Sequence, residues 1–175
     1  MKEFNAEKTD LLSVSICIIL SVLYFVDLNV NMWTFHFSHG NVYHLCANMI
    51  AISSIFKGTN LKLLPLAYVI TSIVWFFAGN GAIGFSAIIF FMWGTRFLND
   101  MIILRDKDKT RNIYLLGIAI TFIVSAILPN VSFSLHFIPF IIGVITGSAM
   151  YLFNQYKTDT KFLKKKHEAF RIERH

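Results

Sequence analysis

Charged residues are scarce in this chain. Asp, Glu, Lys and Arg make up 15% of its 175 residues, whereas hydrophobic residues make up 55%. Because about a quarter of the residues in a soluble domain are charged, the composition excludes an ordinary soluble protein and predicts a single integral membrane domain.

Cysteine is also scarce. Cys17 and Cys46 both lie in apolar stretches, which favours small buried side chains over a disulfide or a metal pair.

The apolar stretches lack the alternation of polar and apolar residues that marks membrane strands. Only helices and closed barrels satisfy the backbone inside lipid, so each stretch is expected to be a helix. The expected spans are about 11–27, 42–56, 61–78, 83–98, 112–128 and 132–153. The sequence therefore predicts an all-α membrane protein, a bundle of six transmembrane helices. The first span is expected to be retained, because it has no small-x-small cleavage site.

Lysine and arginine are missing from three of the expected loops, 28–41, 79–82 and 129–131. Because positively charged loops stay in the cytoplasm, both termini are expected there. Each of the three loops on the opposite side leads into a span that begins with residues of candidate chemistry.

The chain is thus expected to divide into a cytoplasmic N-terminal tail (1–10), a six-span membrane domain (11–153) and a basic cytoplasmic C-terminal tail (154–175). The C-terminal tail, with Lys164, Lys165 and Lys166, is expected to rest against anionic headgroups. The net charge of +6 therefore requires no nucleic-acid partner.

The fourth stretch is too short to cross a bilayer unaided. Ile83 to Thr95 covers about 20 Å at 1.5 Å per residue, whereas the hydrocarbon core is about 30 Å thick. Its outer end is therefore expected below the membrane surface, reached by a loop that lies against protein or water. Ser86 stands at that submerged end.

Three polar motifs interrupt the apolar stretches. Polar side chains are costly in hydrocarbon, so each motif is a functional-site hypothesis. The motifs begin the second, fourth and sixth spans, which run in the same direction, and this predicts a similar depth toward the outer leaflet. They are His39-x4-His44-x3-Asn48, Gly84-Phe85-Ser86-Ala87 and His136-x6-Gly143.

In order and placement these motifs resemble those of the rhomboid family of intramembrane serine proteases, over roughly residues 11–153. The resemblance implies that Ser86 is the nucleophile and His136 the general base, working as a dyad without a carboxylate. The sequence agrees, since the only acidic residue expected on the outer half is Asp27. A partly desolvated, neutral imidazole suits that role.

The same resemblance implies an oxyanion hole built from the side chains of His44 and Asn48 with the Ser86 N–H. In a low-dielectric cavity such donors are typically the largest catalytic contribution. His44 and Asn48 are four residues apart and so share one helix face.

Further residues are given supporting roles by the resemblance. His39 matches a position near the cavity mouth, and Phe90 matches an aromatic residue that packs on the catalytic histidine. Gly84 is expected to let the chain turn steeply into the fourth span. Gly143 forms Gly-x3-Gly with Gly147, which predicts close approach of the sixth span to the fourth.

The function implied is an intramembrane serine endopeptidase that cleaves transmembrane segments of other membrane proteins through an acyl-enzyme. No cofactor and no metal are expected. The expected partners are transmembrane substrates and the lipid bilayer, and the oligomeric state is left open. The compact form suggests a bacterial plasma membrane, with the active site opening toward the extracytoplasmic side.

The chain departs from the family pattern at two positions near the dyad. Ala87 follows the serine where glycine is usual, and Pro139 stands where a small residue is common and is able to kink the helix. The first loop, 28–41, is short and has Trp33-Thr34 in place of a Trp-Arg pair. These departures motivate an alternative, a catalytically inactive relative that binds transmembrane helices.

Two further alternatives come from other classes. His36, His39 and His44 are able to form a zinc or copper site, because imidazole suits both metals. A metal or small-solute transporter is the other alternative. The sequence shows neither an inverted repeat nor an intramembrane charged pair to support it.

Overall fold

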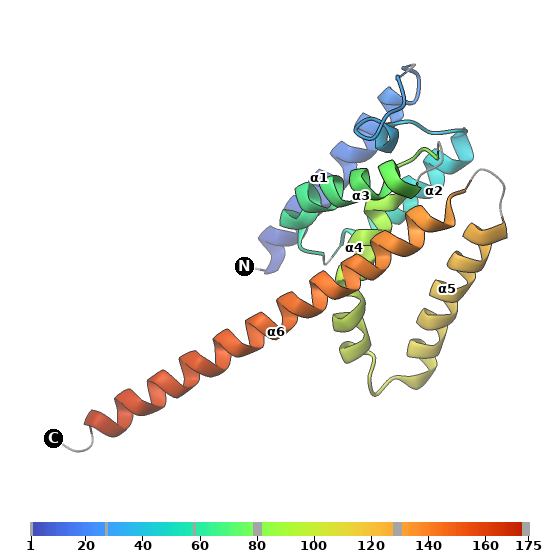
Figure 1. Ribbon diagram of the computed structural model, residues 1–175. Helices are drawn as coiled ribbons and strands as arrows, with labels where there is room; N and C mark the ends of the chain where they lie inside the picture. The colour runs from blue at the N-terminus through green and yellow to red at the C-terminus, as the bar shows by residue number, and fades with distance from the viewer. Residues whose placement is uncertain (1, 27, 58, 79–81, 128–130, 173–175) are drawn as a thin grey trace.

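The chain folds as a bundle of helices (Figure 1). The computed structural model describes residues 2–26, 28–57, 59–78, 82–127 and 131–172, with side chains described between 10 and 160. Asp27 lies outside the described residues. The helices are α1 (Lys2–Leu23), η1 (Phe35–Phe37), α2 (Val42–Ile55), η2 (Leu61–Leu63), α3 (Leu64–Ala78), α4 (Ser86–Ile103), α5 (Asp108–Ile127) and α6 (Phe133–Ile172). The described part contains no strand, which confirms the all-α prediction.

Within the described residues, three helical segments are long and apolar enough to cross a membrane, Leu61–Ala78, Asp108–Ile127 and Phe133–Thr160. Two shorter apolar helices accompany them, Asp10–Leu23 and Val42–Ile55. Each lies within an expected span or overlaps most of one.

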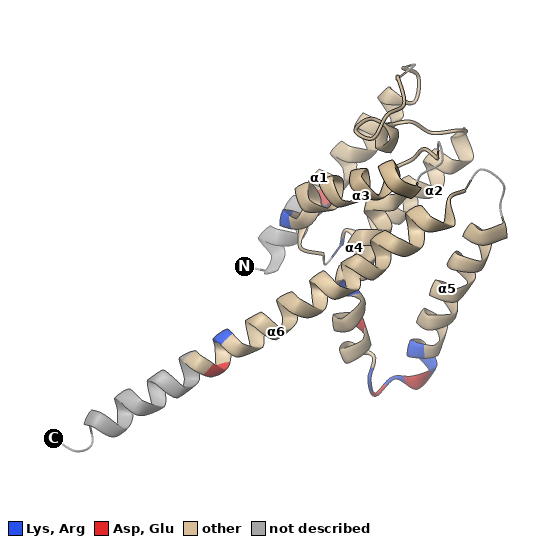
Figure 2. Cartoon of the chain, in the orientation of Figure 1, with Lys and Arg blue, Asp and Glu red and all other residues tan. Residues whose placement is uncertain are grey.

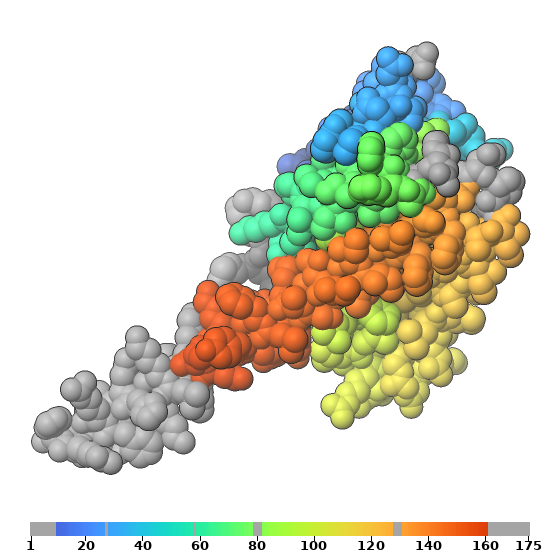
Figure 3. All heavy atoms as spheres, in the orientation of Figure 1, coloured from blue at the N-terminus to red at the C-terminus, as the bar shows by residue number. Residues whose placement is uncertain are grey.

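Helix α4 forms the centre of the bundle. Its residues from Ala87 to Met92 are all buried, together with Gly94. It extends to Ile103, beyond the expected end near residue 98. In Figure 3 the atoms of α6 lie across the front face, with those of α3 on one side and those of α4 and α5 on the other. The span expected to be too short to cross unaided is therefore the most enclosed one.

Backbone contact joins α4 to α6. A Cβ atom on Gly143 would lie 2.2 Å from the Phe91 carbonyl oxygen, and one on Gly147 would lie 2.2 Å from that of Thr95. The predicted close approach through Gly-x3-Gly is thus confirmed. Because residue numbers rise together along both helices, α4 and α6 are parallel.

An ionic cluster ties three helices together at the opposite end from Ser86. The guanidinium of Arg96 bonds the Asp100 carboxylate through two nitrogens, each at 3.2 Å, and donates to the Ile55 carbonyl oxygen at 3.0 Å. The Tyr114 hydroxyl donates to Asp100 at 3.1 Å. This cluster fixes the ends of α2 and α4 against the beginning of α5.

Helix α6 continues through Pro139 and past residue 153 to Ile172 as one helix. Its 40 residues span about 60 Å, roughly twice the hydrocarbon thickness. The segment after 153 therefore projects from the bundle along the helix axis (Figure 1). Its contact with anionic headgroups stays a prediction. Residues 154–172 contain no glycine or proline to end the helix. The side chains of Lys164, Lys165 and Lys166 lie outside those described.

Candidate active site

A serine and a histidine meet where α4 and α6 begin. The Oγ atom of Ser86 lies 2.8 Å from Nε2 of His136, although the two residues are 50 positions apart in the sequence. Ser86 is the first residue of α4, and His136 lies in the first turn of α6. The His136 side chain is 8% exposed, whereas Ser86 is half-buried. A hydroxyl bonded to a largely desolvated imidazole is the arrangement of an activated nucleophile.

Gly84 shapes the approach to the serine. Its φ of 127° lies in the left-handed region, and a Cβ atom there would lie 2.6 Å from Cε1 of His44. Its N–H donates to the Phe35 carbonyl oxygen at 2.8 Å. Only glycine fits this conformation beside His44. The expected steep turn into α4 is therefore found, and it brings α2 against the serine loop.

The backbone N–H of Ser86 is free of intrahelical partners, since the first N–H groups of an α-helix have none. The N-cap residue, Phe85, supplies no side-chain hydrogen bond. The partial positive charge of the α4 N-terminus is thus directed at the region beside the Ser86 hydroxyl. Such a position suits the stabilisation of a developing oxyanion.

Asn48 lies buried on α2 near this N-terminus, and 4% of its surface is exposed. Its Nδ2 lies 3.5 Å from the position of a Cβ atom on Gly84, and 2.9 Å from Nε2 of His39. Burial, with a contribution from nearby His44, lowers the pKa of His39 to about 4, so its ring is neutral at pH 7. The neutral Nε2 accepts one amide hydrogen of Asn48, and the second amide hydrogen is left for another acceptor.

His44 completes the group. Its ring centroid lies 5.3 Å from that of His39, and the ring also lies within electrostatic range of His136. Its backbone N–H is capped by the Asn41 side chain at 2.9 Å, which fixes the start of α2. The structure thus brings the predicted oxyanion residues, His44 and Asn48, to the same place as the predicted dyad.

The positions that depart from the family pattern are accommodated by packing. Ala87 is fully buried against Phe35, Val74 and Leu135. Pro139 is also fully buried, and α6 remains helical through it. Neither position separates the dyad.

Phe90 lies one turn after Ser86 and stacks on the imidazole of His136. The ring centroids are 4.2 Å apart and the planes differ by 17°. This contact restricts the tilt of the imidazole, and it places an apolar surface beside the dyad.

A third residue at the dyad was not predicted from the sequence. Ser125, near the end of α5, has its Oγ atom 2.7 Å from Nδ1 of His136 and 2.8 Å from the Thr121 carbonyl oxygen. Serine in a membrane helix commonly bonds the carbonyl four residues earlier, and Ser125 has that pattern. No sequence signal distinguishes it from other serines of this kind, because its second partner comes from a different helix.

The histidines do not converge as a metal site would require. Nε2 of His36 lies 3.2 Å from Ser72 Oγ and 3.3 Å from Thr71 Oγ1, both on α3, whereas His39 and His44 lie together beside Gly84. Burial lowers the pKa of His36 to about 3. Among the described residues, no three His, Cys, Asp or Glu side chains gather around one point. The role of His36 is to anchor the first loop to α3.

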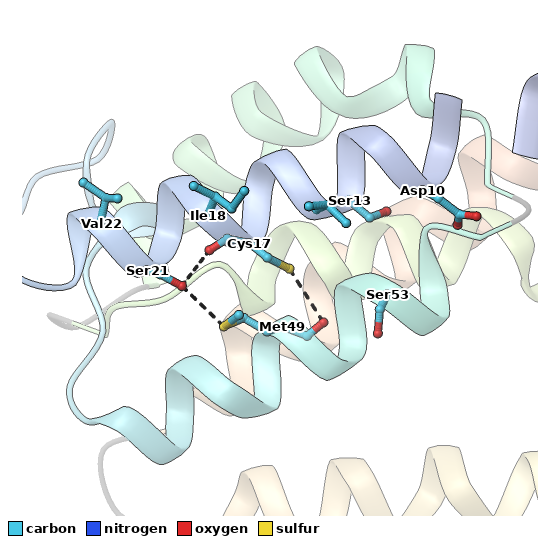
Figure 4. A pocket seen from close by; sticks show the side chains of 9 residues that line it. Asp10, Ser13, Cys17, Ile18, Ser21, Val22, Met49 and Ser53 are labelled. Atoms are coloured by element: carbon cyan, nitrogen blue, oxygen red, sulfur yellow. Dashed lines mark hydrogen bonds between the residues drawn. The ribbon is translucent and has the colours of Figure 1, made fainter. Parts of the chain in front are cut away.

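A separate hollow of about 530 Å³ lies between α1 and α2 (Figure 4). Its polar lining includes Ser13 and Ser21, and Ser21 donates to the Cys17 carbonyl oxygen at 2.8 Å. None of the predicted site residues lines it.

The two cysteines differ in burial. Cys17 is half-buried beside this hollow, but Cys46 is exposed, so the prediction of a buried side chain is wrong for Cys46. An apolar thiol on the surface of a membrane helix is compatible with lipid.

No family model matches this chain, and neither a curated protein nor a solved structure matches it at a significant level.

Proposed function

We propose that the protein is an intramembrane serine endopeptidase of the rhomboid type. The observation that carries the proposal is the 2.8 Å contact between Ser86 Oγ and His136 Nε2, placed beside Gly84, His44 and Asn48. A nucleophile, a base and convergent oxyanion donors are together the groups that catalyse acyl transfer.

In the proposed reaction, His136 Nε2 takes the proton of Ser86 as Oγ attacks the scissile carbonyl carbon. The carbonyl oxygen becomes an oxyanion, which the Ser86 N–H and the side chains of Asn48 and His44 stabilise. His136 then returns the proton to the leaving amine, and an ester to Ser86 remains. Water, deprotonated by the same imidazole, hydrolyses that ester and restores the serine.

The proposed membrane placement has six spans and both termini in the cytoplasm. The described charged residues lie toward the end of the bundle that holds the α4–α5 loop, and the opposite end is free of them (Figure 2). Three polar groups start three helices at that uncharged end, on α2, α4 and α6. The beginning of α4 need not reach the membrane surface, because Gly84 and Phe85, which lead into it, are buried within the protein.

The proposed substrates are transmembrane segments of other membrane proteins, in a bacterial plasma membrane. A peptide bond inside a helix is hidden by its own hydrogen bonds. Cleavage therefore requires local unwinding near the outer end of the substrate helix, and helix-breaking residues such as glycine lower its free energy. Ala87 and Pro139 motivated the alternative of an inactive relative. Both residues are buried without separating Ser86 from His136, so they give that alternative no support.

A fluorophosphonate probe tests the proposal on the purified protein in detergent. We expect labelling of Ser86 in the natural chain, and its loss in both Ser86→Ala and His136→Ala. Ser53→Ala is a matched control, since this hydroxyl bonds only within α2, to the Ile50 carbonyl oxygen. Ser53→Ala should label like the natural chain.

The same variants should be assayed for cleavage of a transmembrane reporter in liposomes, with circular dichroism to verify folding. Absence of labelling and of cleavage in a folded, monodisperse natural chain would reject the proposal. So would full activity of Ser86→Ala after contaminating proteases are excluded.

A further inference from the structure

We propose that Ser125 is a positioning residue for His136, one that holds the imidazole in the tautomer with its hydrogen on Nδ1. The inference rests on the proposed function for its catalytic consequence, whereas the tautomer itself is a property of the resting protein. It gives α5 a part in a site otherwise built from α2, α4 and α6.

The argument begins with the single hydrogen of the Ser125 hydroxyl. The Thr121 carbonyl oxygen, 2.8 Å away, is only able to accept, so the hydroxyl donates its hydrogen there. The Oγ lone pairs then face Nδ1 of His136 at 2.7 Å, and that nitrogen must be the donor. The opposite tautomer would make Ser125 donate to Nδ1 and give up its bond to Thr121.

The tautomer decides what the other ring nitrogen does. With the hydrogen on Nδ1, Nε2 carries a lone pair and accepts from the Ser86 hydroxyl, 2.8 Å away. With the hydrogen on Nε2, the ring would donate to Ser86 and would be unable to take its proton. Ser125 therefore favours the form of His136 that works as a base.

The remaining surroundings leave this selection to Ser125. Phe90 presents a ring face, which offers Nδ1 no lone pair. Ser125 and His136 are 5% and 8% exposed, so little water competes at this contact. His44 is the titratable group within electrostatic range of the ring.

During the reaction Ser125 takes no proton. When Nε2 receives the proton from Ser86, the imidazolium carries hydrogen on both nitrogens, and Nδ1–H remains bonded to Ser125 Oγ. A neutral hydroxyl stabilises that cation less than a carboxylate would, because charge-assisted hydrogen bonds are stronger. The expected effect of Ser125 is accordingly moderate.

The test compares fluorophosphonate labelling rates of the purified full chain in detergent with those of three variants. Ser125→Ala should label about tenfold more slowly, which corresponds to the loss of about one hydrogen bond. Ser125→Thr retains the hydroxyl and its i−4 bond, and should restore the rate to within about threefold. Thr121→Ala is the control, since it removes a hydroxyl bonded to Gly117 and leaves the Thr121 carbonyl oxygen in place.

Nitrogen-15 NMR of the imidazole provides the second measurement, with His136→Gln to assign the signal. We expect the Nδ1–H tautomer in the natural chain and a shift toward a mixture in Ser125→Ala. An Nε2–H tautomer in the natural chain, or equal rates and unchanged spectra in Ser125→Ala, would overturn the inference. If the natural chain does not label at all, the proposed function fails, and the NMR spectra still decide the role of Ser125.

Discussion

Asn48 has two amide hydrogens, and only one has a partner in the described structure. His39 accepts the first at 2.9 Å, and this bond fixes the orientation of the amide. The second is left near Gly84, where the oxyanion is expected to form. A donor held in place before the reaction stabilises the transition state without reorganisation. His39 thus acts through Asn48, which explains its place at the edge of the site.

Replacement of Asn48 by alanine should therefore lower turnover far more than substrate binding. We expect kcat for a transmembrane reporter to fall by about 100-fold, with KM changed by less than about threefold. Asn41→Ala is a matched asparagine control on the same helix, because it removes the α2 cap and costs about 1 kcal/mol of stability without removing this donor. A change confined to KM would show that Asn48 has a binding or structural role.

The candidate dyad could be anticipated from the sequence, because the polar motifs that contain Ser86 and His136 stand at the beginning of apolar segments in a recognisable order. Their 2.8 Å contact and the stacking of Phe90 on His136 required the folded chain. Ser125 was missed for a physical reason. Its local bond to Thr121 is the common one, and the contact that distinguishes it joins two helices.

At the scale of helices, the contact between α4 and α6 determines whether the dyad forms. The two backbones approach so closely that a Cβ atom on Gly143 would lie 2.2 Å from a carbonyl oxygen of α4. Backbone atoms cannot move aside as a flexible side chain would. Any side chain at Gly143 must therefore push α6 away from α4, and His136 moves with α6.

We predict that Gly143→Ala lowers both stability and activity. Overpacking of this kind typically costs about 1–3 kcal/mol, and the separation of Ser86 from His136 should abolish most fluorophosphonate labelling. Gly117→Ala is the control, because nothing lies within 4 Å of the position its Cβ would take on α5. Alanine is the better helix former, so this control should raise the melting temperature slightly. The measurement is thermal unfolding in detergent beside labelling of the same samples. Equal melting temperatures for the two variants would contradict the predicted packing.

Helix positions followed from apolar patterning, whereas several helix ends did not, among them the beginning of α1 at Lys2 and the ends of α4 and α6. Helix α4 passes residue 98 to Ile103, since Arg96 and Asp100 bond each other across one turn and keep the polar segment helical. Helix α6 passes residue 153 because neither glycine nor proline follows before it ends at Ile172. Hydropathy marks where a segment leaves lipid, and the helix itself ends only where its hydrogen bonds end.

The whole molecule is asymmetric in charge and in chemistry. Described charged residues lie toward the end with the α4–α5 loop (Figure 2), and the Ser86–His136 pair lies at the other end. Under the positive-inside rule, this arrangement supports the proposal that the site opens toward the extracytoplasmic side. The two ends can be distinguished by a reagent that does not cross membranes.

Cysteine labelling of intact bacterial cells tests this orientation. In a background of Cys17→Ser and Cys46→Ser, single cysteines are introduced at exposed positions, Val30→Cys in the first loop and Lys107→Cys in the α4–α5 loop. We expect a membrane-impermeant maleimide to label Val30→Cys in intact cells, and Lys107→Cys only after the membrane is permeabilised. Retained fluorophosphonate labelling of each variant verifies the fold.

The reverse pattern would place the site on the cytoplasmic side, and substrates would then have to be cleaved near their inner ends. Labelling of both positions in intact cells would instead mean that an even number of the helices α2, α3 and α4 cross the membrane between them, which the six-span arrangement excludes. The predicted pattern and its reverse both require an odd number of crossings between residues 30 and 107, but only the predicted pattern places residue 30 outside, as the six-span arrangement with cytoplasmic termini requires.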